Sequence, residues 1–325
     1  MLFLIVSFSL IFTFAFSAGI PYVDKGYPYI DGHLPTKTFD ITERGDKSPL
    51  HSVAFIPTDP GVYGIFFFIG GMDSLIAAET YTNYLGRIAG HGFVTIGVDV
   101  GFPVEAKNHK TVLNNLNLRD FADDFIKQYH WLEGNLNRII ENKTKGVSVD
   151  WNYSVIGSHS AGADGVLLMT ERNNTIAKAV VYYEPFSYKF SNPINFTMPA
   201  LIIGTKFAEE HQGLFPPCII PGYGFNHFYD YWRNSERFLI EVKNFGHCDI
   251  LDDDIRLFCD SKHICLTGNS SNINLYHDFA QGVTSSFLVY SLYGYKNDLM
   301  YLTDAKKMPI EVETLKYNLT SAIFP

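Results

Sequence analysis

The stretch YSVIGSHSAGADG, residues 153–165, places a serine between a short apolar strand and a helix. The strand is predicted at 153–157, and the helix is expected to start at about Gly162. Small residues, Ser158 and Gly162, stand two positions before and two positions after Ser160. A very tight turn needs small residues there, because larger neighbouring side chains would collide. The pattern is typical of a nucleophile elbow; the alternative is an ordinary turn between a strand and a helix.

Apolar strands and amphipathic helices alternate along the chain from about residue 50 onward. Further strands are predicted at 64–71, 93–100, 179–183, 200–204 and 238–242. Helices are predicted at about 75–88, 119–140, 162–172 and 278–293. This alternation predicts an α/β fold with a mostly parallel central sheet and helices on both faces. We expect one domain over residues 50–325, preceded by a polar arm at 18–49.

The composition excludes several classes of protein. Of the 325 residues, 46% are hydrophobic and 18% charged, which excludes a disordered chain and a coiled coil. The formal net charge is −9 and the sequence has no basic stripe, so nucleic acid is not expected as a partner. The 27 Phe and 20 Tyr provide much apolar surface, for the core or for an apolar ligand.

Residues 1–17, MLFLIVSFSLIFTFAFS, are apolar, carry no charged side chain and end in small residues. They predict a secretory signal peptide cleaved before Ala18, and the alternative is an uncleaved membrane anchor. We therefore expect a secreted or luminal protein with no stable membrane span after cleavage. Sequons agree with this, and the expected glycosylation sites are Asn142, Asn173, Asn195, Asn269 and Asn318. A sixth sequon, at Asn152, lies beside a predicted core strand and is not expected to be used.

The four cysteines are an even number, which suits an oxidising compartment. Three pairings are possible. The short loop CDSKHIC favours a disulfide between Cys259 and Cys265, which leaves Cys218 to pair with Cys248. Four buried free thiols are the alternative.

A reactive serine needs a general base and amide donors for the developing oxyanion. His247 follows the last predicted strand, where such a base belongs. Ala161, directly after the serine, is expected to supply one donor. Gly71, in the loop FFFIGGM, is the favoured source of the second donor, ahead of Gly70 and Met72.

The acid that orients the histidine has two candidate positions. Glu184 follows strand 179–183, and Glu209 or Glu210 follows strand 200–204. Position alone favours neither, because a carboxylate at either strand end could reach the histidine. The sequence has no clustered ligand motif such as H-E-x-x-H, so no metal and no cofactor are expected.

Four stretches of the chain resemble chlorophyllase, a branch of the α/β-hydrolase superfamily related to platelet-activating-factor acetylhydrolase and dienelactone-hydrolase-like esterases. They are YTNYLGRIAGHGFVTIGVD, the serine elbow, LFPPCIIPGYGFNHFYDYW followed by VKNFGHCDILDDD, and NDLMYLTDAKKMPIEVET. The resemblance covers about residues 50–315. It implies an α/β-hydrolase fold and a serine carboxylic-ester hydrolase, acting on an ester with a bulky or long apolar group.

The resemblance also implies roles for individual residues. Ser160 falls on the family's nucleophile and His247 on its histidine. Glu184 falls on the family's Asp-Pro, which carries the acid, so Glu184 becomes the expected acid with Glu209 in reserve.

The chain departs from the family's Gly-His-Ser-Arg-Gly-Gly elbow at three positions, Ser158, Ala161 and Ala163. It also has Ile69-Gly70 where the family has His-Gly before the oxyanion loop. These departures bear on the substrate more than on the reaction. They also leave a second hypothesis, an inactive hydrolase fold that binds a hydrophobic ligand or a partner protein.

Overall fold

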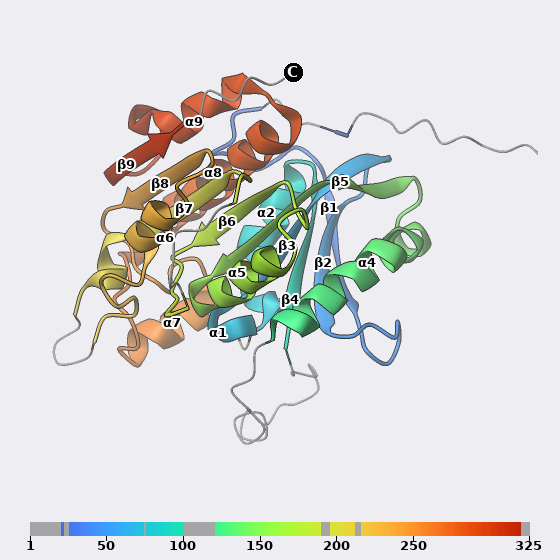
Figure 1. Cartoon of the computed structure of the whole chain (residues 1–325), viewed down its shortest axis with the longest axis horizontal. Coiled ribbons are helices and arrows are strands. Elements are labelled where there is room, and N and C mark those ends of the chain that lie inside the picture. Colours follow the sequence, from blue (N-terminus) through green and yellow to red (C-terminus); the bar gives the residue numbers. More distant parts are fainter. Residues whose placement is uncertain are drawn as a thin grey trace, which may run out of the picture.

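The computed structural model describes residues 21–22, 26–74, 76–100, 121–189, 196–211 and 216–319. A nine-stranded mixed sheet runs through this part of the chain, with helices on both faces (Figure 1). The strand order is β1-β2-β4-β3-β5-β6-β7-β8-β9. Neighbouring strands from β4 to β8 are parallel, whereas β1, β2 and β9 join the sheet antiparallel. The expected α/β-hydrolase architecture is confirmed.

The strands are β1 Thr36–Ile41, β2 His51–Pro57, β3 Gly61–Ile69, β4 Phe93–Asp99, β5 Val147–His159, β6 Ala179–Tyr183, β7 Ala200–Thr205, β8 Arg237–Val242 and β9 Val312–Asn318. The α-helices are α1 Gly71–Ser74, α2 Thr82–Gly90, α4 Ala122–Lys143, α5 Ala163–Arg172, α6 Phe225–Tyr231, α7 Asp253–Ser261, α8 Ile273–Tyr293 and α9 Leu299–Thr303. Short 3-10 turns include η1 Ala78–Tyr81, η2 Ser160–Gly162 and η3 Lys206–Glu209.

The core forms two layers, one on each face of the sheet. In β3, Phe67 packs with the layer beneath α4, α5 and α6, whereas Phe66 and Phe68 pack with the layer beneath α2 and α8. Successive side chains of a strand point to opposite faces, so a strand covered on both faces must be apolar throughout. This is why the parallel strands β3 to β8 could be recognised from short apolar runs. β2 is also buried throughout, but it was not predicted.

The two edge strands differ from the sequence-based expectation. β1 lies within 18–49, which was expected to be only a surface arm, and β9 follows the last expected helix. Both strands are largely exposed, with alternating polar residues and no apolar run. An edge strand can form with little apolar sequence, because most of its surface faces solvent.

The predicted signal peptide at 1–17 and the sequon at Asn195 lie outside the described residues. Within the described ranges, none of the helices combines the length and apolar composition that a bilayer crossing requires. The carboxyl ends of parallel strands β3, β5, β6, β7 and β8 share one edge of the sheet, where α1 and α7 also lie (Figure 1). Open α/β sheets bind ligands at this edge.

Candidate active site

A strained turn at the end of β5 carries Ser160. The residue has a φ of 56°, in the left-handed region that is costly for a residue with a side chain. The backbone of His159 is still extended, and α5 begins three residues after Ser160. A Cβ atom at Gly162 would lie 2.4 Å from the carbonyl oxygen of Gly70 and 2.8 Å from that of Ile69. The glycine is therefore required for the elbow to pack against the end of β3.

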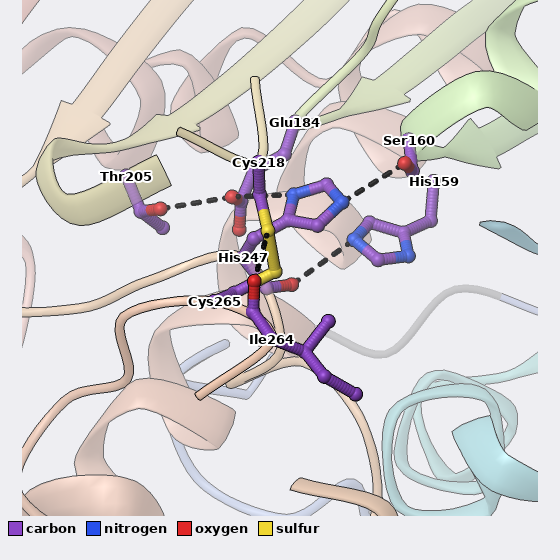
Figure 2. Close-up of a disulfide and its surroundings, with 8 residues drawn as sticks. All are labelled: His159, Ser160, Glu184, Thr205, Cys218, His247, Ile264 and Cys265. Atoms are coloured by element: carbon purple, nitrogen blue, oxygen red, sulfur yellow. Dashed lines mark hydrogen bonds and ion pairs between the residues drawn. A yellow bond between two sulfur atoms is a disulfide. The ribbon is translucent and has the colours of Figure 1, made fainter. Parts of the chain in front are cut away.

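Ser160, His247 and Glu184 form a hydrogen-bonded row at the carboxyl edge of the sheet (Figure 2). The Oγ atom of Ser160 lies 2.9 Å from Nε2 of His247. The Nδ1 atom of His247 lies 3.1 Å from Oε2 of Glu184. The three side chains follow β5, β8 and β6. This is the geometry of a serine, a base and an orienting acid.

The Glu184 carboxylate is fixed from three directions. It is completely buried, and Thr205 Oγ1 donates to its Oε2 atom at 2.8 Å. The hydroxyl of Tyr276 on α8 donates to Oε1 at 3.2 Å. Glu184 itself has a φ of 44°, so the chain turns sharply directly after β6. These contacts leave the carboxylate little freedom of orientation, which favours one position of the imidazole.

Glu209, the reserve acid, lies elsewhere. It is half-buried in η3, and burial raises the pKa of its carboxyl group. A Cβ atom added at Gly224 would lie 3.1 Å from the Oε1 atom of Glu209. Glu210 is exposed. The structure brings Glu184, and neither of the other two glutamates, to His247.

The loop that carries His247 is held by a buried aspartate. The Oδ2 atom of Asp249 accepts hydrogen bonds from Gly246 N at 2.8 Å and from Gly268 N at 2.6 Å. Burial raises the pKa of Asp249 to about 6. The hydrogen bonds from the two glycine amides act in the opposite direction, because they stabilise the charged carboxylate. Asp249 thus joins the His247 loop to the segment that precedes α8.

A disulfide joins Cys218 to Cys265, 47 residues along the chain, so the expected pairing of Cys259 with Cys265 is wrong (Figure 2). Cys248 and Cys259 are buried free thiols that interact with each other. Cys259 lies on α7 with its side chain in the core, whereas Cys265 follows the end of that helix. One cysteine of CDSKHIC thus lies on the helix and the other lies beyond its end. Closeness in sequence therefore did not decide the pairing.

The amide expected to stabilise the oxyanion is already used. Gly71 N donates to the hydroxyl of Tyr81 at 2.8 Å, and Gly70 N donates to Ser74 Oγ at 3.2 Å. The expected Gly71 donor is thus engaged within its own loop in this structure. Met72, the next residue, has a φ of 53° and becomes the candidate on this side. Ala161, the middle residue of η2, remains the candidate on the other side.

Comparison with known proteins agrees with the geometry. The chlorophyllase family model matches residues 170–319, which include Glu184 and His247. A relative named Chlorophyllase-1, chloroplastic, from Citrus sinensis is 23% identical over 317 residues, covering 93% of this chain and 90% of that protein. Chlorophyllase-1 from Arabidopsis thaliana is 22% identical over 308 residues, covering 87% and 90%. Chlorophyllase-2 from the same plant is 20% identical over 292 residues, covering 82% and 85%.

The chain is chlorophyllase-like. Its similarity to the chlorophyllases supports, at the level of that family, a carboxylic-ester hydrolase of the serine type. The pairwise matches extend over most of the chain, whereas the family model begins after Ser160. The assignment of the nucleophile elbow therefore depends on the structure and on the pairwise matches, and not on the family model.

One group of side chains in the described part of this chlorophyllase-like chain is close enough to surround a metal ion, and it consists of His159, Glu184 and His247. Its ligand atoms already make hydrogen bonds, to Tyr81, Thr205 and Ser160 among others. A metal ion would have to take over lone pairs that already accept hydrogen bonds and displace protons that are already donated.

Sequence reasoning missed three residues that support the site. Tyr81, Thr205 and Tyr276 come from η1, the end of β7 and α8. Thr205 directly follows a predicted strand and could have been noticed as a polar residue at the functional edge. Tyr276 had no such signal, because only the packing of α8 brings it to Glu184.

Proposed function

We propose that this chain is a secreted carboxylic-ester hydrolase that acts through a Ser160-His247-Glu184 triad. The observation that carries the proposal is the pair of distances on either side of the His247 ring, 2.9 Å to Ser160 and 3.1 Å to Glu184. The positive φ of Ser160 supports it, since a strained nucleophile turn presents the hydroxyl at the open edge of the sheet.

The mechanism follows from these positions. His247 Nε2 takes the proton of the Ser160 hydroxyl as the oxygen attacks the ester carbonyl carbon. The amides of Met72 and Ala161 stabilise the resulting oxyanion. His247 then returns the proton to the departing alcohol, and an acyl-serine remains. Water, deprotonated by His247, attacks the acyl carbon, releases the acid and restores Ser160. Glu184 holds the Nδ1–H tautomer throughout.

The substrate is an ester with a bulky apolar group. Phe186 follows the acid, and its amide donates to the Ser160 carbonyl oxygen at 3.1 Å. The Phe186 and Tyr188 rings are 4.7 Å apart, and the Tyr188 and Tyr223 rings 4.6 Å. Tyr188 is 59% exposed and Tyr223 40% exposed. Exposed rings in edge-to-face contact beside a nucleophile provide an apolar surface for an ester.

A substrate panel tests the activity. It contains p-nitrophenyl acetate, a long-chain p-nitrophenyl ester, a short-acyl phospholipid and chlorophyll, each assayed with the wild type and Ser160→Ala. We expect turnover with the apolar esters and a loss of about 10⁴-fold or more in Ser160→Ala. A fluorophosphonate probe should label the wild type at Ser160 only. Folded wild type that is neither labelled nor active would refute the enzyme and favour an inactive binding protein.

Secretion has separate support. The apolar residues 1–17 predict a signal peptide, and a disulfide suits an oxidising compartment. Asn142, Asn269 and Asn318 are exposed and Asn173 is half-buried; Asn152, not expected to be used, is exposed as well. Expression in a secreting eukaryotic cell should yield medium-borne protein that starts at Ala18 and shifts to lower mass with an N-glycosidase. Retention of residues 1–17 in a membrane fraction would contradict the proposal.

A further inference from the structure

Two buried side chains connect the oxyanion loop to the loop of the catalytic histidine. Tyr81, the last residue of η1, accepts a hydrogen bond from Gly71 N at 2.8 Å. Its hydroxyl lies 2.9 Å from Nδ1 of His159, the last residue of β5. The Nε2 atom of His159 lies 3.2 Å from the carbonyl oxygen of His247 (Figure 2). We call Tyr81 and His159 together the Tyr81–His159 bridge.

Each proton of the bridge can take only one position. The Gly71 amide can only donate, so the Tyr81 oxygen accepts, and its own proton must go to His159 Nδ1. The His247 carbonyl can only accept, so the proton of His159 is on Nε2. Burial lowers the pKa of His159 well below its usual value, which keeps the ring neutral. The four groups therefore form a continuous chain with a fixed direction.

This series of hydrogen bonds ends at the oxyanion loop on one side and at the His247 loop on the other. Ester hydrolysis requires that these two loops keep a fixed relative position. At one end, the fixed Gly71 amide sets the peptide that precedes the Met72 donor. At the other end, the fixed carbonyl group belongs to His247 itself. The His159 ring also packs on the His247 ring, with centroids 4.5 Å apart and planes 31° apart. A displacement of one loop is thereby transmitted to the other.

The packing around the Tyr81–His159 bridge holds the Tyr81 hydroxyl and the His159 ring in fixed positions. Tyr81 is completely buried and His159 is 3% exposed. A Cβ atom at Gly71 would lie 3.3 Å from both the Tyr81 hydroxyl and His159 Nδ1, so a side chain there would crowd both groups of the bridge. The Tyr81 ring packs edge-on against Phe68 at 5.0 Å.

We propose that Tyr81 and His159 are positioning residues for ester hydrolysis, which hold the oxyanion donor and His247 in one geometry. The proposal rests on the proposed esterase function. It goes beyond that function because the triad and the oxyanion donors can be described without either residue.

Tyr81→Phe removes one hydroxyl and keeps the ring. We expect kcat to fall about 10- to 100-fold with KM changed less than about threefold, since small displacements of reacting groups affect the transition state most. Tyr84→Phe is the matched control, because Tyr84 is also buried and also loses a hydroxyl bond, to Thr284 at 3.0 Å. Tyr84 does not touch either loop through its hydroxyl, so its variant should keep kcat within about twofold.

His159 provides a second pair of variants. In His159→Gln the side-chain amide can still accept from Tyr81 and donate to the His247 carbonyl group, whereas His159→Phe can do neither. We expect the Gln variant to be at least about tenfold more active than the Phe variant at similar melting temperature. The Tyr81→Phe/His159→Phe double variant should lose little more than the worse single variant, because residues acting as a unit are not additive.

A measurement on the wild type avoids any dependence on folding of the variants. Nitrogen-15 NMR of the imidazoles, with His159→Gln to assign the signal, should show His159 neutral and protonated at Nε2 at neutral pH. An Nδ1–H tautomer, or a Tyr81→Phe kcat equal to that of Tyr84→Phe, would overturn the proposal. Absence of fluorophosphonate labelling in wild type would instead refute the underlying esterase function, so the two failures are distinguishable.

Discussion

The elbow after β5 and the loop after β8 each carry one reacting group, but different contacts hold them. The elbow is defined by neighbours in sequence, from Ser158 to Gly162, packed on the end of β3. The His247 loop depends on distant residues: Asp249 accepts from Gly268, 19 positions away, and His247 O lies against His159, 88 positions away. A short motif was therefore enough to predict the elbow and its geometry, whereas for His247 the sequence predicted only the position after a strand, and long-range contacts fix its orientation.

The largest effect is expected where the two regions meet. Glu184→Gln keeps the shape of the acid but offers an amide where His247 Nδ1–H needs an acceptor. We expect kcat to fall about 10³- to 10⁴-fold, as for the loss of the carboxylate in other triads. Steady-state hydrolysis of the preferred ester measures it. Glu209→Gln is the matched control and should remain within about twofold of wild type; a larger loss there would restore Glu209 as the acid.

The elbow is tested by a single methyl group. Gly162→Ala forces a Cβ atom to within 2.4 Å of the Gly70 carbonyl oxygen. We expect unfolding to become easier by about 1–3 kcal/mol and activity to fall about 100-fold or more. Gly134→Ala in α4 is the control, since nothing lies within 4 Å of its added methyl group. That variant should be more stable by about 0.5–1 kcal/mol. Equal effects in urea unfolding would contradict the account of the elbow.

The His247 side is tested by its disulfide. Replacing both Cys218 and Cys265 by Ser should lower the free energy of unfolding by about 2–4 kcal/mol, since the bridge closes a loop of 47 residues. A thiol reductant should shift the melting temperature of wild type toward that of the double variant and leave the double variant unchanged. Activity should fall by about tenfold or less, a smaller loss than in Gly162→Ala. The reverse order would mean that the long-range contacts matter more than the elbow.

The smallest effect concerns pH. The pKa of Asp249 is raised to about 6 in the fold, from 3.8 for a free carboxyl group. The folded state therefore holds this proton more strongly than the unfolded state between these two values. The stabilisation from the protonated form is complete below pH 4 and is lost as pH rises through about 6.

Asp249→Asn imitates the protonated form and keeps an oxygen for the two glycine amides. The melting temperature of Asp249→Asn should rise relative to that of wild type as the pH increases from about 4 to 6. Calorimetry at several pH values measures the difference between the two proteins. Asp254→Asn, an exposed change on α7, should follow wild type at every pH. A constant difference between Asp249→Asn and wild type would show that Asp249 does not titrate in this range.

Much of the fold followed from the sequence, because buried parallel strands are apolar throughout. β6 was predicted at its observed bounds, and the predicted α5 began within one residue. β1 and β9 were not predicted, because edge strands face solvent and lack this signal. β2 was not predicted either, although it is buried throughout. η1 was predicted as part of a longer helix, since helical spacing does not distinguish a 3-10 turn from the start of α2.

For the candidate site, the sequence by itself determined the elbow at Ser160, the position of His247 after the last parallel strand and two windows for the acid. These features are local: a small-residue turn, a strand end, a polar residue beyond it. Only the tertiary structure brought Glu184 rather than Glu209 to His247, paired Cys218 with Cys265, engaged the Gly71 amide with Tyr81 and gave His159 a partner at each ring nitrogen. The physical reason is that these choices depend on which groups from separate strands and helices come within hydrogen-bond distance, and no spacing along the chain encodes that distance.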